Sequence, residues 1–199
     1  MKSKVGIICI ILGVLLLSGA LLLAVFNRRQ DAAARDAAAK IMAHLGQEIQ
    51  ENSAGELQIP PELLTDEDKK MTEVEIDGHA YIGYLSIPNL GLELPVMSSW
   101  SYPQLRRAPC RYSGSVRGED LVLMAHNYKT HFGRISHLNL HDSVSFTDMD
   151  GITTQYKVAA LDILESTAVE TMTAGEFDLT LFTCTYGGKS RVTVYCNKE

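Results

Sequence analysis

A cysteine and an arginine near the carboxyl end of the chain have the spacing of neighbours across a β-hairpin. Residues 179–184 alternate in the manner of a strand, and Gly187-Gly188 then predicts a two-residue turn, because glycine adopts positive φ at no steric cost. This turn places Cys184 opposite Arg191 on one face of the sheet, with Cβ atoms about 4.5–5.5 Å apart. A guanidinium beside the sulfur favours the thiolate, which is the nucleophile, and could also stabilise an oxyanion. We expect Cys184 to be a nucleophile; the alternative is a small buried core residue.

Four of the six histidines lie within sixteen residues of one another. His126 directly follows the apolar run 121–125, so it lies where a rigid strand meets an open loop, a common place for catalytic side chains. We expect His131, His137 and His141 to be surface or loop-packing residues. Histidine is also the commonest metal ligand, but the spacing matches no compact zinc pattern and no Cys-x-x-Cys accompanies it. No metal or cofactor is therefore expected, and a His-rich metal-binding module remains the alternative.

Three further cysteines accompany Cys184. Cys9 lies in an apolar run, while Cys110 and Cys196 are either bridged or, as the simpler interpretation, two buried thiols. In the hairpin register above, Cys196 lies opposite Leu179 and on the face opposite Cys184. The net charge of −6 argues against general nucleic-acid binding.

From about residue 72 onward, the sequence is typical of short strands. These strands must position the candidate residues. Turn residues separate them, and a helical turn is expected within 98–107. Seven or eight strands with little helix predict a closed or nearly closed β-barrel over residues 72–199. The expected strands are 81–87, 91–96, 121–125, 144–146, 155–164, 179–184 and 191–196.

The amino end predicts a membrane helix and a stalk. Residues 5–26 contain no charge, which is long enough to span a bilayer; a cleaved signal peptide would have a shorter apolar core. Residues 31–52 are rich in Ala, Glu, Gln and Lys, and Asp31 is expected to be the N-cap of a second helix. Residues 27–71 are thus expected to form a helical stalk and a linker, the linker beginning at Ser53.

Taken together, these features resemble the sortases, the cysteine transpeptidases of Gram-positive cell surfaces. The resemblance rests on Thr180-Leu181-Phe182-Thr183-Cys184 as a Thr-Leu-x-Thr-Cys strand, on His126 within residues 123–127, and on Arg191 on the next strand. It covers roughly residues 81–196. It implies an eight-stranded closed β-barrel with short helices, in agreement with the strand count.

The resemblance also implies a reaction. Cys184 would attack the carbonyl between Thr and Gly of a Leu-Pro-x-Thr-Gly-like sorting signal, forming a thioester that an amine resolves. His126 would protonate the leaving amine and deprotonate the incoming one. Arg191 would hold the substrate or the oxyanion, with Thr183 and Thr185 as weaker candidates for such contacts, the latter through its backbone N–H.

The implied partners are surface proteins with a carboxy-terminal sorting signal and an amine of peptidoglycan or of a pilin. Basic residues flank the apolar run on both sides, so orientation follows from function: residues 1–4 inside, the catalytic domain on the extracellular face. The amino-terminal helix favours a class B-like enzyme and the short Cys-to-Arg hairpin a class D-like one. A sortase-like scaffold that binds sorting signals without turnover is a further alternative.

Overall fold

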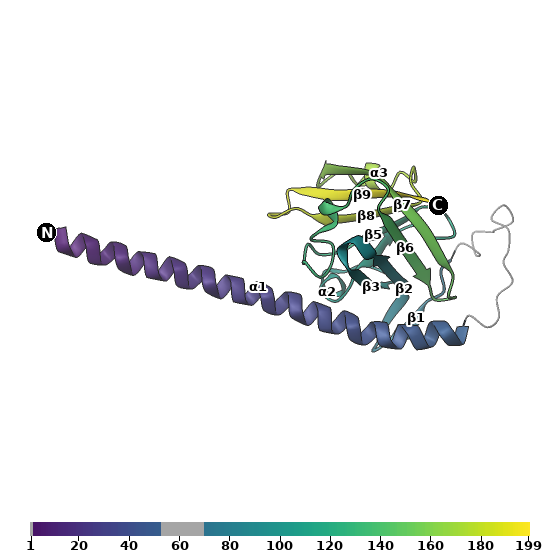
Figure 1. Ribbon diagram of the computed structural model, residues 1–199, viewed down its shortest axis with the longest axis horizontal. Helices are drawn as coiled ribbons and strands as arrows, with labels where there is room; N and C mark the ends of the chain where they lie inside the picture. The colour runs from purple at the N-terminus through teal and green to yellow at the C-terminus, as the bar shows by residue number, and fades with distance from the viewer. Residues whose placement is uncertain (1, 53–69) are drawn as a thin grey trace.

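A long helix and a β-sheet body make up the computed structural model, which describes residues 2–52 and 70–199 (Figure 1). The predicted linker 53–69 lies outside the described residues. Helix α1 (Lys2–Asn52) is continuous, so the expected break is wrong: Asp31 lies inside the helix and is no N-cap. Neither Pro nor Gly occurs between Phe26 and Asp31, so nothing in the sequence interrupts the backbone hydrogen bonds there.

The amino-terminal part of α1 has the character of a membrane span. Its apolar side chains are exposed on every side of the helix, with Leu17 73% and Leu22 70% accessible, and Figure 1 shows this part extending away from the barrel. A helix that is apolar all round and unpacked is suited to lipid. By length and hydropathy α1 is therefore a candidate membrane anchor.

The described residues form nine strands in one sheet, with the order β1-β2-β3-β4-β5-β8-β9-β7-β6. A further pairing of β2 with β6 closes eight of them into a barrel and leaves β1 outside the closure. Two pairs are parallel, β3 with β4 and β5 with β8. The predicted eight-stranded closed β-barrel is thereby confirmed. The strands are β1 (Val74–Ile76), β2 (His79–Ile87), β3 (Leu92–Met97), β4 (Cys110–Ser113), β5 (Leu121–Met124), β6 (Ser143–Asp148), β7 (Thr153–Glu165), β8 (Leu179–Cys184) and β9 (Ser190–Lys198).

Two strands are not predicted from the sequence because they are short. Strand β1 has three residues, and β4 joins β3 through the single pair Met97–Cys110. Neither shows enough alternation to stand out. The described helical turns are η2 (Pro88–Leu90), α2 (Tyr102–Leu105), η3 (Ile135–His137) and α3 (Val169–Met172), of which α2 confirms the turn expected within 98–107.

The second half of α1 packs along the outside of the barrel. Leu45 is fully buried and Ile41 8% exposed in a cluster that includes Tyr81 and Met97. Lys40 of α1 also forms an exposed ion pair with Asp77 at 3.5 Å. Burying apolar side chains of this size stabilises the contact by roughly 1.5–3 kcal/mol each. The helix is therefore part of the folded body from about residue 30 onward (Figure 1).

Candidate active site

The hairpin register predicted for Cys184 is confirmed. Strands β8 and β9 pair Cys184 with Arg191 and Leu179 with Cys196. The turn itself differs from the prediction, because the Gly188 N–H donates to the Thr185 carbonyl at 2.9 Å. Its central residues are consequently one position earlier than expected, although both glycines do have positive φ, 85° and 72°.

Strand β5, which ends two residues before His126, runs beside β8 on the side opposite β9. The parallel β5–β8 register pairs Met124 with Phe182, and the Ala125 N–H donates to the Phe182 carbonyl at 3.3 Å. The Thr183 hydroxyl in turn donates to the Ala125 carbonyl at 2.8 Å. Continued two positions beyond Met124 and Phe182, this register would bring His126 level with Cys184, where neighbouring strands are about 4.8 Å apart. Arg191 on β9 is paired with Cys184, and His126 follows two residues after β5 on the other side of β8; we call these three positions the His–Cys–Arg row.

The row lies on the outer face of the barrel. Leu123 and Leu181 are fully buried in the barrel core, and successive residues of a strand point to opposite faces. The row falls at the alternate positions, next to an apolar cluster in which Phe182 packs near Met172 of α3. Cys184 is partly exposed. A thiol at this place is reachable from solvent, unlike one inside the barrel.

Arg191 is beside Cys184 along the backbone, but its guanidinium is engaged elsewhere. Its Nη1 donates to the carbonyl oxygens of Gly188 at 3.0 Å and Ser190 at 3.2 Å. The side chain therefore bonds the end of the β8–β9 hairpin in this structure. A guanidinium has five N–H donors, so three or more remain for a substrate.

The two weaker candidates are both occupied in the sheet. Thr183 is 4% exposed and ties β8 to β5 through its hydroxyl. The Thr185 N–H, considered as an oxyanion donor, donates to the Ser190 carbonyl at 2.9 Å. An oxyanion at that N–H would have to share or displace this hydrogen bond.

His126 lies in a partly buried aromatic setting. Its ring centroid is 5.0 Å from that of Tyr128, which in turn is 5.5 Å from the ring of His131. Burial lowers the pKa of His126 below its ordinary value, and the positive charge of Arg106 lowers it further. The imidazole is thus kept neutral, as a proton acceptor, over a wider pH range. Arg106 and Tyr128 were not singled out from the sequence, because nothing local marks their proximity to His126.

The loop after His126 is tied to α1. The Tyr128 hydroxyl donates to Gln30 Oε1 at 3.2 Å, and the Lys129 N–H donates to Asp31 Oδ1 at 3.2 Å. The Thr130 hydroxyl donates to the Asp31 carbonyl at 3.4 Å. These partners are almost a hundred positions apart in sequence, and no sequence signal announces them. The helix that leads out of the apolar run therefore holds the loop next to the candidate catalytic histidine.

The remaining histidines do not converge. His131 is fully buried, whereas His137 and His141 are exposed. Across residues 2–52 and 70–199, no three His, Cys, Asp or Glu side chains come close enough to hold a metal ion. The metal-binding alternative consequently has no ligand cluster in the described part of the chain.

Cys110 and Cys196 are free, buried thiols that belong to different core clusters, as the simpler interpretation held. Burial raises the pKa of each to about 12. Both therefore stay protonated at neutral pH and lack the nucleophilic thiolate form.

Aromatic side chains line the outer face beside the row. Tyr112 packs edge-on against Phe182 at 5.3 Å and is stacked on Trp100 at 5.9 Å. Trp100 is 42% exposed, and Tyr102, at 6.2 Å from it, is 72% exposed. This series of rings leads from solvent to Phe182, two residues before Cys184, and offers apolar contacts to a peptide.

Comparisons with known proteins identify the fold and the family. The family model of the Sortase domain matches residues 85–199, more than half of the chain. Sortase C1 from Streptococcus suis is 26% identical, with 61% of this chain and 74% of that one covered and a TM-score of 0.54. Sortase C from Clostridium perfringens is 22% identical, with 79% of this chain and 88% of that one covered and a TM-score of 0.55. Sortase C1 from Streptococcus agalactiae is 20% identical, with 69% of this chain and 78% of that one covered and a TM-score of 0.55. No curated protein sequence gives a significant match.

Proposed function

The chain belongs to the sortase family of cysteine transpeptidases, and we propose that it cleaves a carboxy-terminal sorting signal of the Leu-Pro-x-Thr-Gly type and joins the protein to an amine of peptidoglycan or of a pilin. The observation that carries this proposal is the His–Cys–Arg row. Cys184 and Arg191 are paired across β8 and β9 on the outer face of the barrel, and the β5–β8 register supports His126 as their neighbour on the other side of Cys184. The class B-like or class D-like assignment stays a prediction.

In the proposed reaction the Cys184 sulfur attacks the carbonyl carbon of the signal's threonine. His126 takes the proton of the Cys184 thiol and passes it to the leaving amine as the C–N bond breaks, and a thioester remains. An acceptor amine then loses a proton to His126 and attacks the thioester, which releases the sulfur and forms a new amide. Water in place of the amine would give slow hydrolysis.

Arg191 is the proposed partner of the oxyanion or of the substrate backbone. Its bonds to the Gly188 and Ser190 carbonyls are both made by Nη1, so the N–H groups of Nε and Nη2 remain for a substrate at Cys184. Bonds from this guanidinium to neutral carbonyls are also weaker than a bond from it to an oxyanion, in which both groups are charged. We expect substrate binding to redirect this side chain.

The anchor completes the proposal. With residues 1–4 inside the cell and residues 5–26 in the bilayer, α1 would carry the barrel directly onto the extracellular membrane surface. Since α1 packs on the barrel from about residue 30, the body would be held close to the bilayer and not on a free stalk. Surface proteins that leave the membrane would then pass near Cys184.

The test uses the full chain in detergent with a panel of Leu-Pro-x-Thr-Gly-like and Asn-Pro-x-Thr-like peptides. Intact mass should reveal an acyl adduct that disappears in Cys184→Ala and persists in Cys9→Ala, a matched loss of a thiol outside the site. His126→Ala should lose the adduct or accumulate it, since either half of the proton transfer can fail first. Peptide binding without any adduct would refute transpeptidation and support the scaffold alternative.

A further inference from the structure

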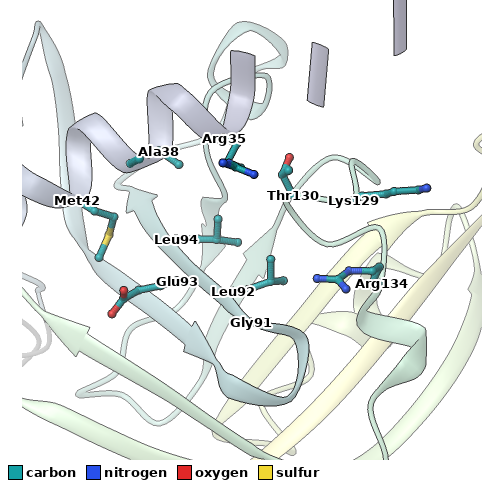
Figure 2. Close-up of a pocket in the computed structure, with 11 residues that line it drawn as sticks. Arg35, Ala38, Met42, Gly91, Leu92, Glu93, Leu94, Lys129, Thr130 and Arg134 are labelled. Atoms are coloured by element: carbon teal, nitrogen blue, oxygen red, sulfur yellow. The ribbon is translucent and has the colours of Figure 1, made fainter. Parts of the chain in front are cut away.

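A cavity of about 500 Å³ lies between α1 and the barrel (Figure 2). It is formed by the second half of α1, by strand β3 with the turn before it, and by the loop after His126. None of His126, Cys184 and Arg191 lines it. Its lining residues are Arg35, Ala38, Ala39, Met42, Gly91, Leu92, Glu93, Leu94, Lys129, Thr130 and Arg134.

The cavity has an apolar floor and a cationic rim. Leu92, Leu94 and Ala38 are 8%, 4% and 5% exposed and make up the floor. Figure 2 shows the guanidinium groups of Arg35 and Arg134 entering from opposite sides, one from α1 and one from the loop after His126. Positive charge thus gathers at one place in a chain whose net charge is −6.

The positive charges of these side chains have few ion pairs or hydrogen bonds with the residues that the structure describes. No ion pair or hydrogen bond of the Arg35 or Lys129 side chain occurs there. Arg134 donates from Nη2 to the Leu90 carbonyl, but its Nε is buried and has no partner. Glu93, a carboxylate of the lining, is exposed, and in Figure 2 it points away from Arg134 and toward Met42. A buried donor without a partner is costly, so the Arg134 Nε favours a ligand that satisfies it, whereas Arg35 and Lys129 are exposed and add positive charge.

We propose that this cavity binds a phosphate ester that carries a small apolar group. A guanidinium group can donate two parallel hydrogen bonds to the oxygens of a phosphate. Two guanidinium groups that face one cavity balance the phosphate charge of about −1.5 to −2 at neutral pH. The apolar group would lie on Leu92 and Leu94, and about 500 Å³ is ample for a small organic ligand.

Distance from the membrane favours a soluble ester over a lipid. Arg35 comes nine residues after Phe26, the end of the apolar run, which is about 14 Å along a helix. A headgroup layer is only about 5–8 Å thick. The phosphate of an ordinary lipid in the bilayer would therefore fall short of Arg35.

Binding would join two parts of the protein. Arg35 belongs to α1, whereas Arg134 belongs to the loop that starts beside His126 and already bonds Asp31 through Lys129 and Thr130. A phosphate between the two guanidinium groups bridges the anchor helix and this loop. The ligand is thus expected to stabilise the docked position of α1.

The experiment is calorimetric titration of the full chain in a neutral detergent with phenyl phosphate and, separately, with inorganic phosphate. We expect one phenyl phosphate per chain and weaker binding of inorganic phosphate, which lacks the contact with the floor. Arg35→Gln/Arg134→Gln should weaken phenyl phosphate binding at least tenfold. The control Arg29→Gln/Lys189→Gln removes the same charge at exposed positions outside the cavity and should bind as the wild type does.

Arg35→Gln alone keeps the test valid if the double variant does not fold, because this side chain is exposed and makes no ion pair with the other residues that the structure describes. This single substitution should weaken binding at least threefold. Repeating the phenyl phosphate titration in nanodiscs distinguishes a lipid phosphate from a soluble phosphate ester as the natural occupant of the cavity. Weaker phenyl phosphate binding in discs with phosphatidylglycerol than in pure phosphatidylcholine discs would support a lipid phosphate as the occupant, and equal binding a soluble ester. No saturable binding, or equal binding by wild type and Arg35→Gln/Arg134→Gln, would overturn the proposal.

Discussion

The buried hydroxyl of Thr183 is expected to hold the candidate active site together. It donates to the Ala125 carbonyl at 2.8 Å and so ties β8 to β5 one residue before Cys184 and one residue before His126. Thr183→Val keeps the shape of the side chain and removes this bond. The buried carbonyl loses a donor, which costs about 1–3 kcal/mol of unfolding free energy.

The same sheet offers a matched control. Thr193, on the adjacent strand β9, is fully buried, and its hydroxyl has no hydrogen-bond partner among the described residues. Thr193→Val therefore removes a polar atom without breaking a bond and should leave stability unchanged or increase it. The two substitutions are chemically identical and differ only in what the hydroxyl contacts.

The assay is urea unfolding of the full chain in detergent, followed by circular dichroism, together with the rate of acyl-enzyme formation on a sorting-signal peptide. Thr183→Val should lower both the unfolding free energy and, through the spacing of His126 and Cys184, the acylation rate. Thr183→Ser, which retains the hydroxyl, should restore most of the rate. Equal stability of Thr183→Val and Thr193→Val would refute the reasoning.

Three further predictions concern His126, His131 and the loop that follows His126. Arg106→Gln should raise the pKa of His126, which burial would still hold below its ordinary value; NMR titration of the imidazole checks this, and an unchanged or lower pKa would contradict it. The pKa of His131 is lowered to about 4, chiefly by burial, so the unfolded chain binds its proton first and stability falls as pH drops below about 6.5. Between pH 7 and pH 4.5 this loss should be about 2–3 kcal/mol in urea unfolding and absent in His131→Phe; parallel curves for the two proteins would speak against it. Asp31→Ala should slow acyl-enzyme formation several-fold while changing the unfolding free energy by less than about 1.5 kcal/mol, whereas Asp36→Ala, exposed on the same helix, should be neutral in both measurements.

Much of the barrel and one side of the site could be predicted from local pattern. The alternation of residues 179–184 and the glycine pair fixed which residue faces Cys184, and the structure has Arg191 there. Such a register depends only on residues close in sequence, because a short turn joins the two strands. The apolar run at the amino end likewise predicted a helix suited to a bilayer, since length and composition decide that by themselves.

Helix boundaries and short strands were less predictable. The N-cap expected at Asp31 does not exist, because capping preference is weaker than the continuity of a helix that packs on the barrel. Strands β1 and β4 depend on their neighbours in the sheet and carry almost no pattern of their own.

The sequence by itself determined the residue types of the site, the Cys184–Arg191 pairing and the apolar anchor. Only the tertiary structure decided that the strand before His126 runs beside the strand of Cys184, since a parallel pairing of β5 with β8 joins residues 58 positions apart. It also decided that Arg106 and Tyr128 surround His126 and that Gln30 and Asp31 hold its loop. These contacts form between segments that are far apart in sequence, and the pattern of apolar and polar residues along the chain does not predict such contacts.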